Sequence, residues 1–406
     1  MVAGKVLTMH KKIRCGFLIF VVITIIPTAV TAREFGVPHP YRSVQAAVNA
    51  ASPGDTVVLA PGRHKGAVSI SKQLTLVGAG QTRTTIHEHV GDGAVVTIKN
   101  SSVTISGLEV NGGILNTAGG QSDGKFAGRF RQTSTHGIVA TESNVTLNDV
   151  AVNNVRNHLI TIERGTLFVE NISLMARSKW IHQADIGIAV RGSTTKISEL
   201  SQRSGTLDHT VDINNPGRED IKWGRSDVSV ESSVIRASEL SWGECIRTYT
   251  NSTLTVKSTE CYRDPGGREP KYNNHSGISV NGYNNHVHIT GNRFLRVPWG
   301  VNVYGSKGES NSIVIEENSF IDNEIGGIYI HGMNYQGIDL GGGHLGSKGR
   351  NVFNNTKTFD IELGPRSNAT ISALNNRWSS KNPEDSIWDQ MDDPELGKVR
   401  WNGDIE

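Results

Sequence analysis

The sequence GISVN at Gly277–Asn281 is followed by HVHITGNRF at His286–Phe294, and this pattern then repeats. The second copy is GVNVY at 300–304 with SIVIEENSF at 312–320, and GIYIH at 327–331 begins a third. The copies start 23 and 27 positions apart, and their apolar residues alternate as in strands with one buried face. Because no copy could bury its own apolar face, the copies must stack. The pattern predicts an all-β solenoid, the right-handed parallel β-helix.

An asparagine stands two residues before the phenylalanine of each complete copy, at Asn292 and Asn318. Asparagine tolerates left-handed backbone and is common in turns. We therefore expect these residues to close each coil at a turn. Stacked copies would form an internal Asn ladder.

The composition favours the same class of fold. The chain has 406 residues, of which 45 are glycine and 6% are aromatic. Many short strands joined by tight turns have this composition, and a helical protein does not. The length suits one elongated repeat domain or two globular ones.

The first 32 residues differ from the rest of the chain. A basic segment, with Lys5 and Arg14 at its ends, precedes an apolar run at Gly16–Ile26 and the small residues Val30-Thr31-Ala32. This is the pattern of a secretory signal peptide. The alternative, an uncleaved membrane anchor, needs a longer apolar run. We predict cleavage after Ala32, a secreted or periplasmic protein, and no membrane association after cleavage.

Charge and cysteine content narrow the functional classes. The signal carries four positive charges and no negative one, so its removal changes the net charge from +2 to −2. A nucleic-acid-binding protein needs a basic surface, and none is predicted here. Cys245 and Cys261 remain in the mature chain. They are either a disulfide, as export allows, or two buried thiols inside the coil.

One segment has a helical pattern. Ser43 can cap a helix that continues to Ala51 and places Val44, Ala47 and Val48 on one face. A solenoid exposes its core at both ends, so a capping element is required there. The predicted organisation is a signal at 1–32, an N-terminal cap with this helix at 33–52, coils at 53–378 and a C-terminal cap at 379–406.

The sequence SVQAAVNAASPGDTVVLAPG at Ser43–Gly62, followed by LTLVGAG at Leu74–Gly80, resembles the opening of the pectin-lyase-like right-handed β-helix superfamily. The repeats from Val95 to Trp378 continue this resemblance over most of the mature chain. It implies the fold. It implies no single activity, because the superfamily includes lyases, hydrolases, esterases, epimerases and proteins without a known reaction.

Alternate residues of the strand that opens each coil should point outward, and parallel stacking should align them about 4.8 Å apart. In the middle coils these outward residues form a polar and aromatic stripe: Arg191, Asp212, Arg247, Tyr249, Asn281, Tyr304, Tyr329 and His331. Tyr rings stack on sugar faces, and Arg binds carboxylates through its planar fork. The stripe favours an acidic polysaccharide as partner. The alternative is an ordinary solvated sheet face.

A loop contains Arg263-Asp264-Pro265-Gly266-Gly267-Arg268. Its Arg-x-Pro-x-x-Arg pattern is similar to a short motif of pectate lyases. The resemblance implies that Arg263 is the base and that Arg268 binds a substrate carboxylate. The acidic calcium ligands of that family are not recognisable here, so calcium lacks support and no cofactor is predicted. The alternative is a charged turn with internal ion pairs.

β-Elimination from a uronate needs a neutralised carboxylate, a base for the C5 proton and an acid for the leaving oxygen. We assign neutralisation to Arg247 and Arg268, and orientation to Asp212. The candidate bases are Tyr249, His275 and Arg263. Substrate binding is assigned to the remaining stripe residues: Arg191, Asn281, Tyr304, Tyr329 and His331.

Other enzyme signatures of the superfamily are missing. Asp392-Asp393 is the only Asp-Asp pair, and it lies in the predicted C-terminal cap, so a hydrolase with two facing carboxylates is poorly supported. His87 with His89, and His286 with His288, lack Cys or carboxylate partners nearby, so no metal site is predicted.

The sequence thus predicts an exported, monomeric β-helix that binds an anionic, uronate-containing polysaccharide, with β-elimination as its candidate reaction. The first alternative is a non-catalytic carbohydrate-binding or cell-surface structural protein. The second is a periplasmic factor for metal-cofactor maturation, a role that some proteins of this repeat type perform.

Overall fold

The computed structural model describes residues 31–88, 93–113, 136–155, 157–175, 186–202, 207–216, 223–237, 243–265, 275–305, 311–333 and 337–403. Arg33–Glu406 forms one compact unit, and the fold below is the fold of this unit. Nearly all of the predicted signal peptide lies outside the described residues.

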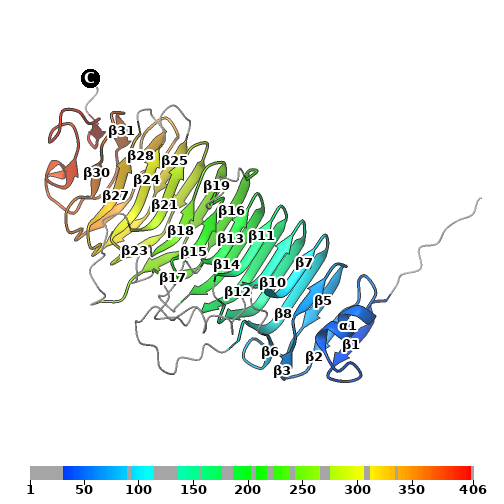
Figure 1. The fold of residues 1–406 in the computed structure, drawn as a ribbon. Helices are drawn as coiled ribbons and strands as arrows, with labels where there is room; N and C mark the ends of the chain where they lie inside the picture. The colour runs from blue at the N-terminus through cyan, green and yellow to red at the C-terminus, as the bar shows by residue number, and fades with distance from the viewer. Residues whose placement is uncertain are drawn as a thin grey trace, which may run out of the picture. The chain divides into compact units, whose positions relative to one another are not determined.

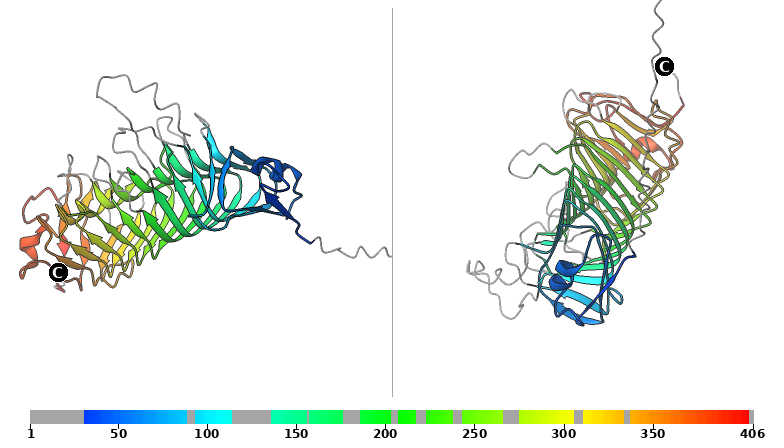
Figure 2. Two further views of the ribbon diagram at one scale, coloured as in Figure 1. Left: turned by 90° about the horizontal axis from the view of Figure 1, so that it is seen from below. Right: turned by 90° about the vertical axis from the view of Figure 1, so that its right-hand side faces the viewer.

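Short parallel strands make up the unit, and in Figure 1 they stack in chain order from α1 and β1 at the blue end to β31 near the red end. Figure 2 shows the same stack from two further sides. Among the described residues, twelve strands form one sheet: β4 (Val68–Ile70), β7 (Ala94–Lys99), β9 (His136–Thr141), β11 (His158–Glu163), β13 (Ile186–Arg191), β15 (His209–Ile213), β18 (Glu244–Thr248), β21 (Ser276–Gly282), β24 (Trp299–Gly305), β27 (Gly326–His331), β30 (Ile361–Leu363) and β32 (Ile387–Trp388).

The other described strands form a second, 21-stranded sheet. Its members are β1 (Glu34–Val37), β2 (Thr56–Leu59), β3 (Gly62–Lys65), β5 (Leu74–Val77), β6 (Thr84–His87), β8 (Ser102–Asn111), β10 (Asn144–Asn153), β12 (Thr166–Met175), β14 (Thr194–Gln202), β16 (Ser226–Glu231), β17 (Val234–Arg236), β19 (Ser252–Lys257), β20 (Glu260–Tyr262), β22 (His286–Thr290), β23 (Arg293–Leu295), β25 (Ser312–Glu316), β26 (Ser319–Ile321), β28 (Ile338–Gly341), β29 (Val352–Asn354), β31 (Ile371–Ala373) and β33 (Val399–Arg400).

The predicted capping helix is present as α1 (Val44–Ala50). Ser43 is its N-cap, and the Ser43 side chain accepts a hydrogen bond from the Ala46 amide at 3.2 Å. Val44, Ala47 and Val48 are buried. At the other end, a short 3₁₀ helix (Pro383–Ser386) precedes β32, and β32 and β33 pair in parallel with β30 and β31. Parallel pairing therefore continues into residues 379–406, the range predicted as a separate cap.

Inside the coils, apolar side chains align from strand to strand. Ile246, Ile278, Val301 and Ile328 occupy one row of the twelve-stranded sheet and are at most 1% exposed. Burying each such side chain contributes about 2 kcal/mol. The row runs through the coils, so each coil covers the apolar face that its neighbour could not bury alone.

The repeated Gly-Ile start has a packing reason. A Cβ on Gly277 would lie 2.6 Å from the Phe294 ring, and one on Gly327 would lie 2.6 Å from the Phe353 ring. Phe294, Phe320, Phe353 and Trp378 stack in order, with ring centroids 5.1, 4.9 and 5.5 Å apart. Glycine therefore makes room for the aromatic ring of its own coil.

The Asn ladder predicted from Asn292 and Asn318 is present. The Asn292 side-chain amide donates to Asn318 at 3.0 Å, Asn318 donates to Asn351 at 3.1 Å, and Asn351 donates to Asn376 at 3.0 Å. We predicted left-handed backbone at the ladder residue itself, and this prediction is wrong. The structure has it one residue earlier, for example at Glu317 (φ 58°). The preceding residue makes the turn, which leaves the Asn amide free to point into the coil.

The two cysteines of the mature chain form a disulfide. Cys245 in β18 and Cys261 in β20 are bonded, and both are buried at 1% and 2% exposure. Of the two alternatives that the sequence left open, the structure has the disulfide. It links the two sheets within one coil.

Candidate functional site

Three residues of the predicted stripe, Asp212, Arg247 and Tyr329, lie in one row across the twelve-stranded sheet. Consecutive members of this row are register partners in adjacent parallel strands, so they are about 4.8 Å apart. The row contains Val139, Thr161, Ala189, Asp212, Arg247, Ser279, Asn302, Tyr329, Glu362 and Trp388. We call it the central row.

A second group of predicted residues lies two positions further along the strands. Asn281, Tyr304 and His331 are register partners in β21, β24 and β27. Two positions along a strand place side chains on the same face. The sheet therefore brings these three residues beside Ser279, Asn302 and Tyr329 of the central row.

A charged cluster is formed by Asp212 and Arg247 of the central row with Arg191, which lies two positions beyond Ala189 in β13. Asp212 is fully buried and accepts hydrogen bonds from Arg191 Nη2 at 2.7 Å and Arg247 Nε at 3.0 Å. Burial alone would raise the pKa of Asp212, but the two guanidinium groups outweigh it and lower this pKa to about 2. Asp212 is therefore an anion at neutral pH.

Glu244 extends this cluster. Its Oε2 lies 3.8 Å from Arg247 Nε and 3.0 Å from His209 Nδ1. Burial opposes the charge of Arg247, but Asp212 and Glu244 raise the pKa of the guanidinium above its ordinary value. Arg247 thus remains charged, with its Cζ 5.1 Å from the centre of the Tyr249 ring. Within the described part of the chain, its terminal nitrogens have no hydrogen-bond partner.

His275, Tyr249 and Tyr304 are near enough to Glu244 for its carboxylate to affect the pKa of each. Burial lowers the pKa of His275, although Glu244 acts in the opposite direction, so the imidazole is neutral at neutral pH. Burial raises the pKa of Tyr304 and of Tyr249. Both phenols therefore keep their protons. A neutral imidazole can accept a proton, and a protonated phenol can donate one.

Aromatic rings continue along the face beyond the cluster. The Tyr329 ring centroid lies 5.4 Å from that of Trp299 and 6.0 Å from that of Tyr304, and Tyr304 lies 5.8 Å from His331. Trp299 is buried, whereas Tyr304, Tyr329 and His331 are half-buried. This part of the face offers apolar ring surfaces with polar edges.

Two predictions about the stripe need correction. We expected all of its residues at the surface, but Asp212 is fully buried and Arg191 is 6% exposed. Their mutual ion pair explains this, because a buried charge needs a partner. Asp212 therefore accepts from both arginines and is shielded from solvent.

Of the two motif-based assignments, only that of Arg263 falls on the described residues. The Arg263 side chain is 3% exposed, and its Nη1 lies 2.5 Å from Glu324 Oε2. A buried, ion-paired guanidinium is a poor base, because the carboxylate stabilises its protonated form. Arg263 therefore fits the alternative of a charged turn with internal ion pairs. Arg268 lies outside the described residues.

Sequence reasoning missed Glu244, His209, Trp299 and Glu362. The first three stand at or next to a strand start, one position before the glycine or its equivalent. These three residues would have been predicted if that position had been counted among the outward residues. Glu362 follows Tyr329 in the central row, and burial raises the pKa of its carboxyl group.

Two further features concern metal ions and membranes. Among the described residues, no group of three or more His, Cys, Asp or Glu side chains is arranged to hold a metal ion. Likewise, none of the helices in this part of the chain has the length and apolar character needed to span a bilayer.

Comparison of the chain with solved structures identifies the fold. The chain aligns with PfbA, a surface adhesin of Streptococcus pneumoniae, at a TM-score of 0.52 and 13% identity, with 88% of each chain covered. The chain therefore has the fold of a right-handed parallel β-helix. This β-helix also aligns with an alginate lyase from Paenibacillus sp. str. FPU-7, at a TM-score of 0.46 and 14% identity over 91% of this chain and 98% of that one.

A third match of the β-helix is a polygalacturonase from Erwinia carotovora ssp. carotovora, at a TM-score of 0.44 and 14% identity over 91% of this chain and 96% of that one. Residues 268–385 match the family model DUF1565, a protein family of unknown function. No curated protein matches the sequence. The likeness to PfbA shows the fold alone.

Proposed function

We propose that the outward face of the twelve-stranded sheet, from Arg191 to His331, binds an acidic polysaccharide and cleaves it by β-elimination. The observation that carries this proposal is the state of Arg247. Its Nε is held by Asp212 at 3.0 Å, and no group among the described residues bonds its terminal nitrogens. A guanidinium fixed at one edge presents the other edge as a fork that matches a carboxylate.

The surroundings of Arg247 favour a polymer over a small anion. Tyr304, Tyr329 and His331 continue the face over the following strands, at about 4.8 Å per strand. Their ring contacts of 5.8 to 6.0 Å form an extended aromatic surface. Sugar rings have apolar faces that stack on such side chains. Several sugar residues would therefore contact the face at once.

The reaction uses three groups of this face. In the proposed step, Arg247 binds the uronate carboxylate and stabilises the negative charge that develops when C5 loses its proton. Neutral His275 takes that proton as base. The electron pair of the C5–H bond forms the C4–C5 double bond, the C4–O bond breaks, and the Tyr304 phenol protonates the leaving oxygen.

Asp212 has a positioning role in this scheme. It touches Arg191 and Arg247 but is itself fully buried. Holding a guanidinium in place before the substrate arrives reduces the reorganisation needed in the transition state. Export through the N-terminal signal, with cleavage after Ala32, and a monomeric state belong to the same proposal.

The test is to incubate the purified protein with alginate, polygalacturonate and glycosaminoglycans and to follow the ultraviolet absorbance of the unsaturated uronate product. We expect absorbance to rise with one of these polymers. We also expect the Arg247→Lys variant to lose most of the rise. No rise with any polymer, together with no retention on gels that contain them, would overturn the proposal.

Non-catalytic binding is the second candidate function, and one observation favours it. Asp212 and Glu244 carry two negative charges beside Arg191 and Arg247, so the arginines of the cluster are already balanced by carboxylates. Such a site holds a carboxylate weakly and suits repeated contacts along a polymer. Retention on a polysaccharide gel without any absorbance rise would establish this function.

A further inference from the structure

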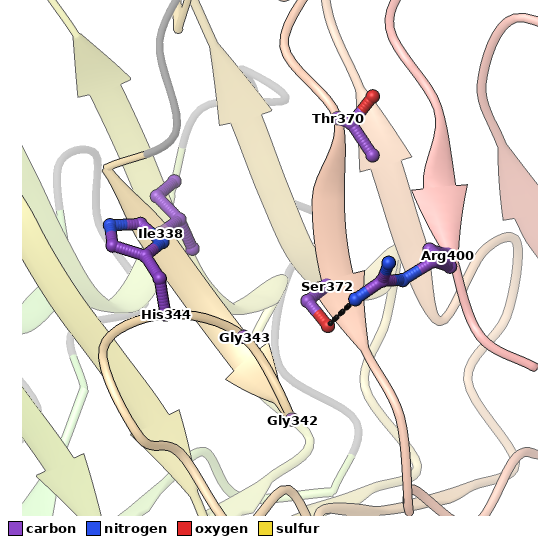
Figure 3. Close-up of a pocket in the computed structure, with 7 residues that line it drawn as sticks. All are labelled: Ile338, Gly342, Gly343, His344, Thr370, Ser372 and Arg400. Atoms are coloured by element: carbon purple, nitrogen blue, oxygen red, sulfur yellow. Dashed lines mark hydrogen bonds between the residues drawn. The ribbon is translucent and has the colours of Figure 1, made fainter. Parts of the chain in front are cut away.

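A cavity lies at the last coils of the unit, on strands that do not contribute to the charged cluster. Its volume is about 210 Å³, and Figure 3 shows its lining. The lining residues come from β28, the glycine turn after it, β31 with its preceding residue, and β33: Ile338, Gly342, Gly343, His344, Thr370, Ser372 and Arg400. Their polar groups are a guanidinium, an imidazole and two hydroxyls, with no carboxylate.

The glycine turn that walls this cavity is held rigidly by Asp339. Asp339 Oδ1 accepts from the amides of Gly341 and Gly343 at 3.0 Å, and Oδ2 accepts from those of Leu345 and Ser347 at 3.0 and 3.2 Å. A Cβ on Gly343 would lie 2.8 Å from the Asp339 carboxylate. The turn is thus preformed, and a side chain at Gly343 would break it.

Asp339, Ser372 and Arg400 are successive register partners on β28, β31 and β33. Two strand spacings of about 4.8 Å separate Asp339 from Arg400. Asp339 uses both oxygens on backbone amides, and among the described residues it forms no ion pair with Arg400. Ser372 occupies the position between them, and its hydroxyl donates to Gly341 O at 2.7 Å.

Arg400 is the unusual group of the cavity. Figure 3 shows its side chain reaching toward Ser372, whose hydroxyl is 3.5 Å from Nη2. Its Nε is buried and has no hydrogen-bond partner among the described residues. No carboxylate in this part of the chain forms an ion pair with it. Arg400 is half-buried, and a bound oxyanion would pair its charge and accept from its unbonded N–H groups.

We propose that this cavity binds one acidic monosaccharide unit, with its carboxylate on Arg400 and its hydroxyls on Thr370, Ser372 and His344. The size supports a single unit, because about 210 Å³ is below the roughly 300–1,000 Å³ of pockets that hold drug-sized ligands. The mixture of one cation with hydroxyl groups matches a ligand that is both anionic and hydroxylated. The cavity is a separate site, so the inference does not depend on the function proposed for the long face.

Calorimetric titration with glucuronate, glucose and sulfate tests the inference. We expect glucuronate to bind, glucose not to bind, and Arg400→Gln to weaken glucuronate binding by about tenfold or more, as for the loss of a charged hydrogen bond. Arg350→Gln is the matched control, since Arg350 is 68% exposed and pairs with Glu317. It should leave glucuronate binding unchanged.

A second variant and a sulfate titration also test the site. Thr370→Val removes an exposed hydroxyl at nearly constant volume and should weaken glucuronate binding about threefold, even if Arg400→Gln proves unstable in a thermal melt. Sulfate binding as tight as glucuronate binding would overturn the sugar assignment. Absence of glucuronate binding, or equal binding by wild type, Arg400→Gln and Thr370→Val, would overturn the site itself.

Discussion

Arg247 donates from its Nε to Asp212 at 3.0 Å, from a position directly beside it in the next parallel strand. This contact uses the inner edge of the guanidinium and leaves the terminal edge without a partner among the described residues. Arg191 approaches the same carboxylate at 2.7 Å. One buried carboxylate therefore fixes two arginines, and only Arg247 retains an unused terminal edge.

Arg247→Lys tests this geometry. Lysine keeps the charge but loses the planar fork, so its single ammonium cannot bond both Asp212 and a substrate carboxylate in the same arrangement. We expect affinity for the preferred uronate polymer to fall about tenfold or more. Affinity electrophoresis in gels containing the polymer measures this change.

Arg293→Lys provides the control for that measurement. Arg293 lies on β23 in the other sheet, is 45% exposed and pairs with Glu260. The same substitution there should leave affinity unchanged. Equal losses in the two variants would mean that the effect is a general loss of surface arginine and not a property of the Asp212 cluster.

Asp212→Asn tests how much the charged cluster contributes to the free energy of unfolding. It removes the charge that two buried guanidinium groups share, and breaking such a buried arrangement costs about 3–5 kcal/mol. We expect the free energy of unfolding in urea to fall by about this amount. A fall below 1 kcal/mol, about the value of an exposed ion pair, would show that water reaches the cluster freely.

The pH dependence of stability provides a second test of Asp212. Its folded pKa of about 2 is below the ordinary 3.8, so its contribution is fully present above pH 3.8 and is lost as pH falls toward 2. The difference in unfolding free energy between wild type and Asp212→Asn should therefore shrink between pH 4 and pH 2. Urea titrations of the two proteins at several pH values measure that difference.

Much of the fold could be predicted because the repeat encodes its own contacts. Gly277 and Phe294 belong to one copy of the repeat. In the structure the phenylalanine ring occupies the space that a side chain at position 277 would need. Alternation of apolar residues also predicted which side of each strand faces the core. A pattern with period 2 fixes the side but does not fix what covers it.

The site could be predicted only as far as this alternation reaches. The alternation predicted Asp212, Arg247 and Tyr329 in one row, and the strand register of the structure has them in one row. It did not predict that Asp212 is fully buried, because burial depends on partners in other coils. His209 contacts Glu244, which is 35 positions later in the sequence. Because the coils differ in length, this spacing could not be predicted from the repeat.

His275→Gln tests the proposed base. Glutamine keeps a polar side chain but cannot take a proton, so elimination should slow about 100-fold or more while polymer affinity stays near that of wild type. Steady-state kinetics on the preferred polymer separate the two effects. His286→Gln, on the exposed start of β22, is the control and should keep full activity.

The pH profile carries an independent prediction for His275. Burial lowers its pKa below the ordinary 6.5, so the imidazole is still a neutral base somewhat below that pH. Activity should therefore persist below pH 6.5 and decline only in more acidic solution. A decline that begins well above pH 6.5 would assign the base to a different group.

Asn318→Ala tests the internal ladder. The buried Asn318 amide donates to Ile289 O at 2.9 Å, Glu316 O at 2.8 Å and the Asn351 side chain at 3.1 Å. Alanine would leave these acceptors without that donor inside the coil, where an unsatisfied polar group costs about 1–3 kcal/mol. We expect a loss of about 3–5 kcal/mol in unfolding free energy.

Asn144→Ala, at an exposed position of β10, is the control. It should change the unfolding free energy by less than about 0.5 kcal/mol, since surface substitutions rarely have a larger effect. Equal small effects at both positions would show that the coils are held by apolar packing alone.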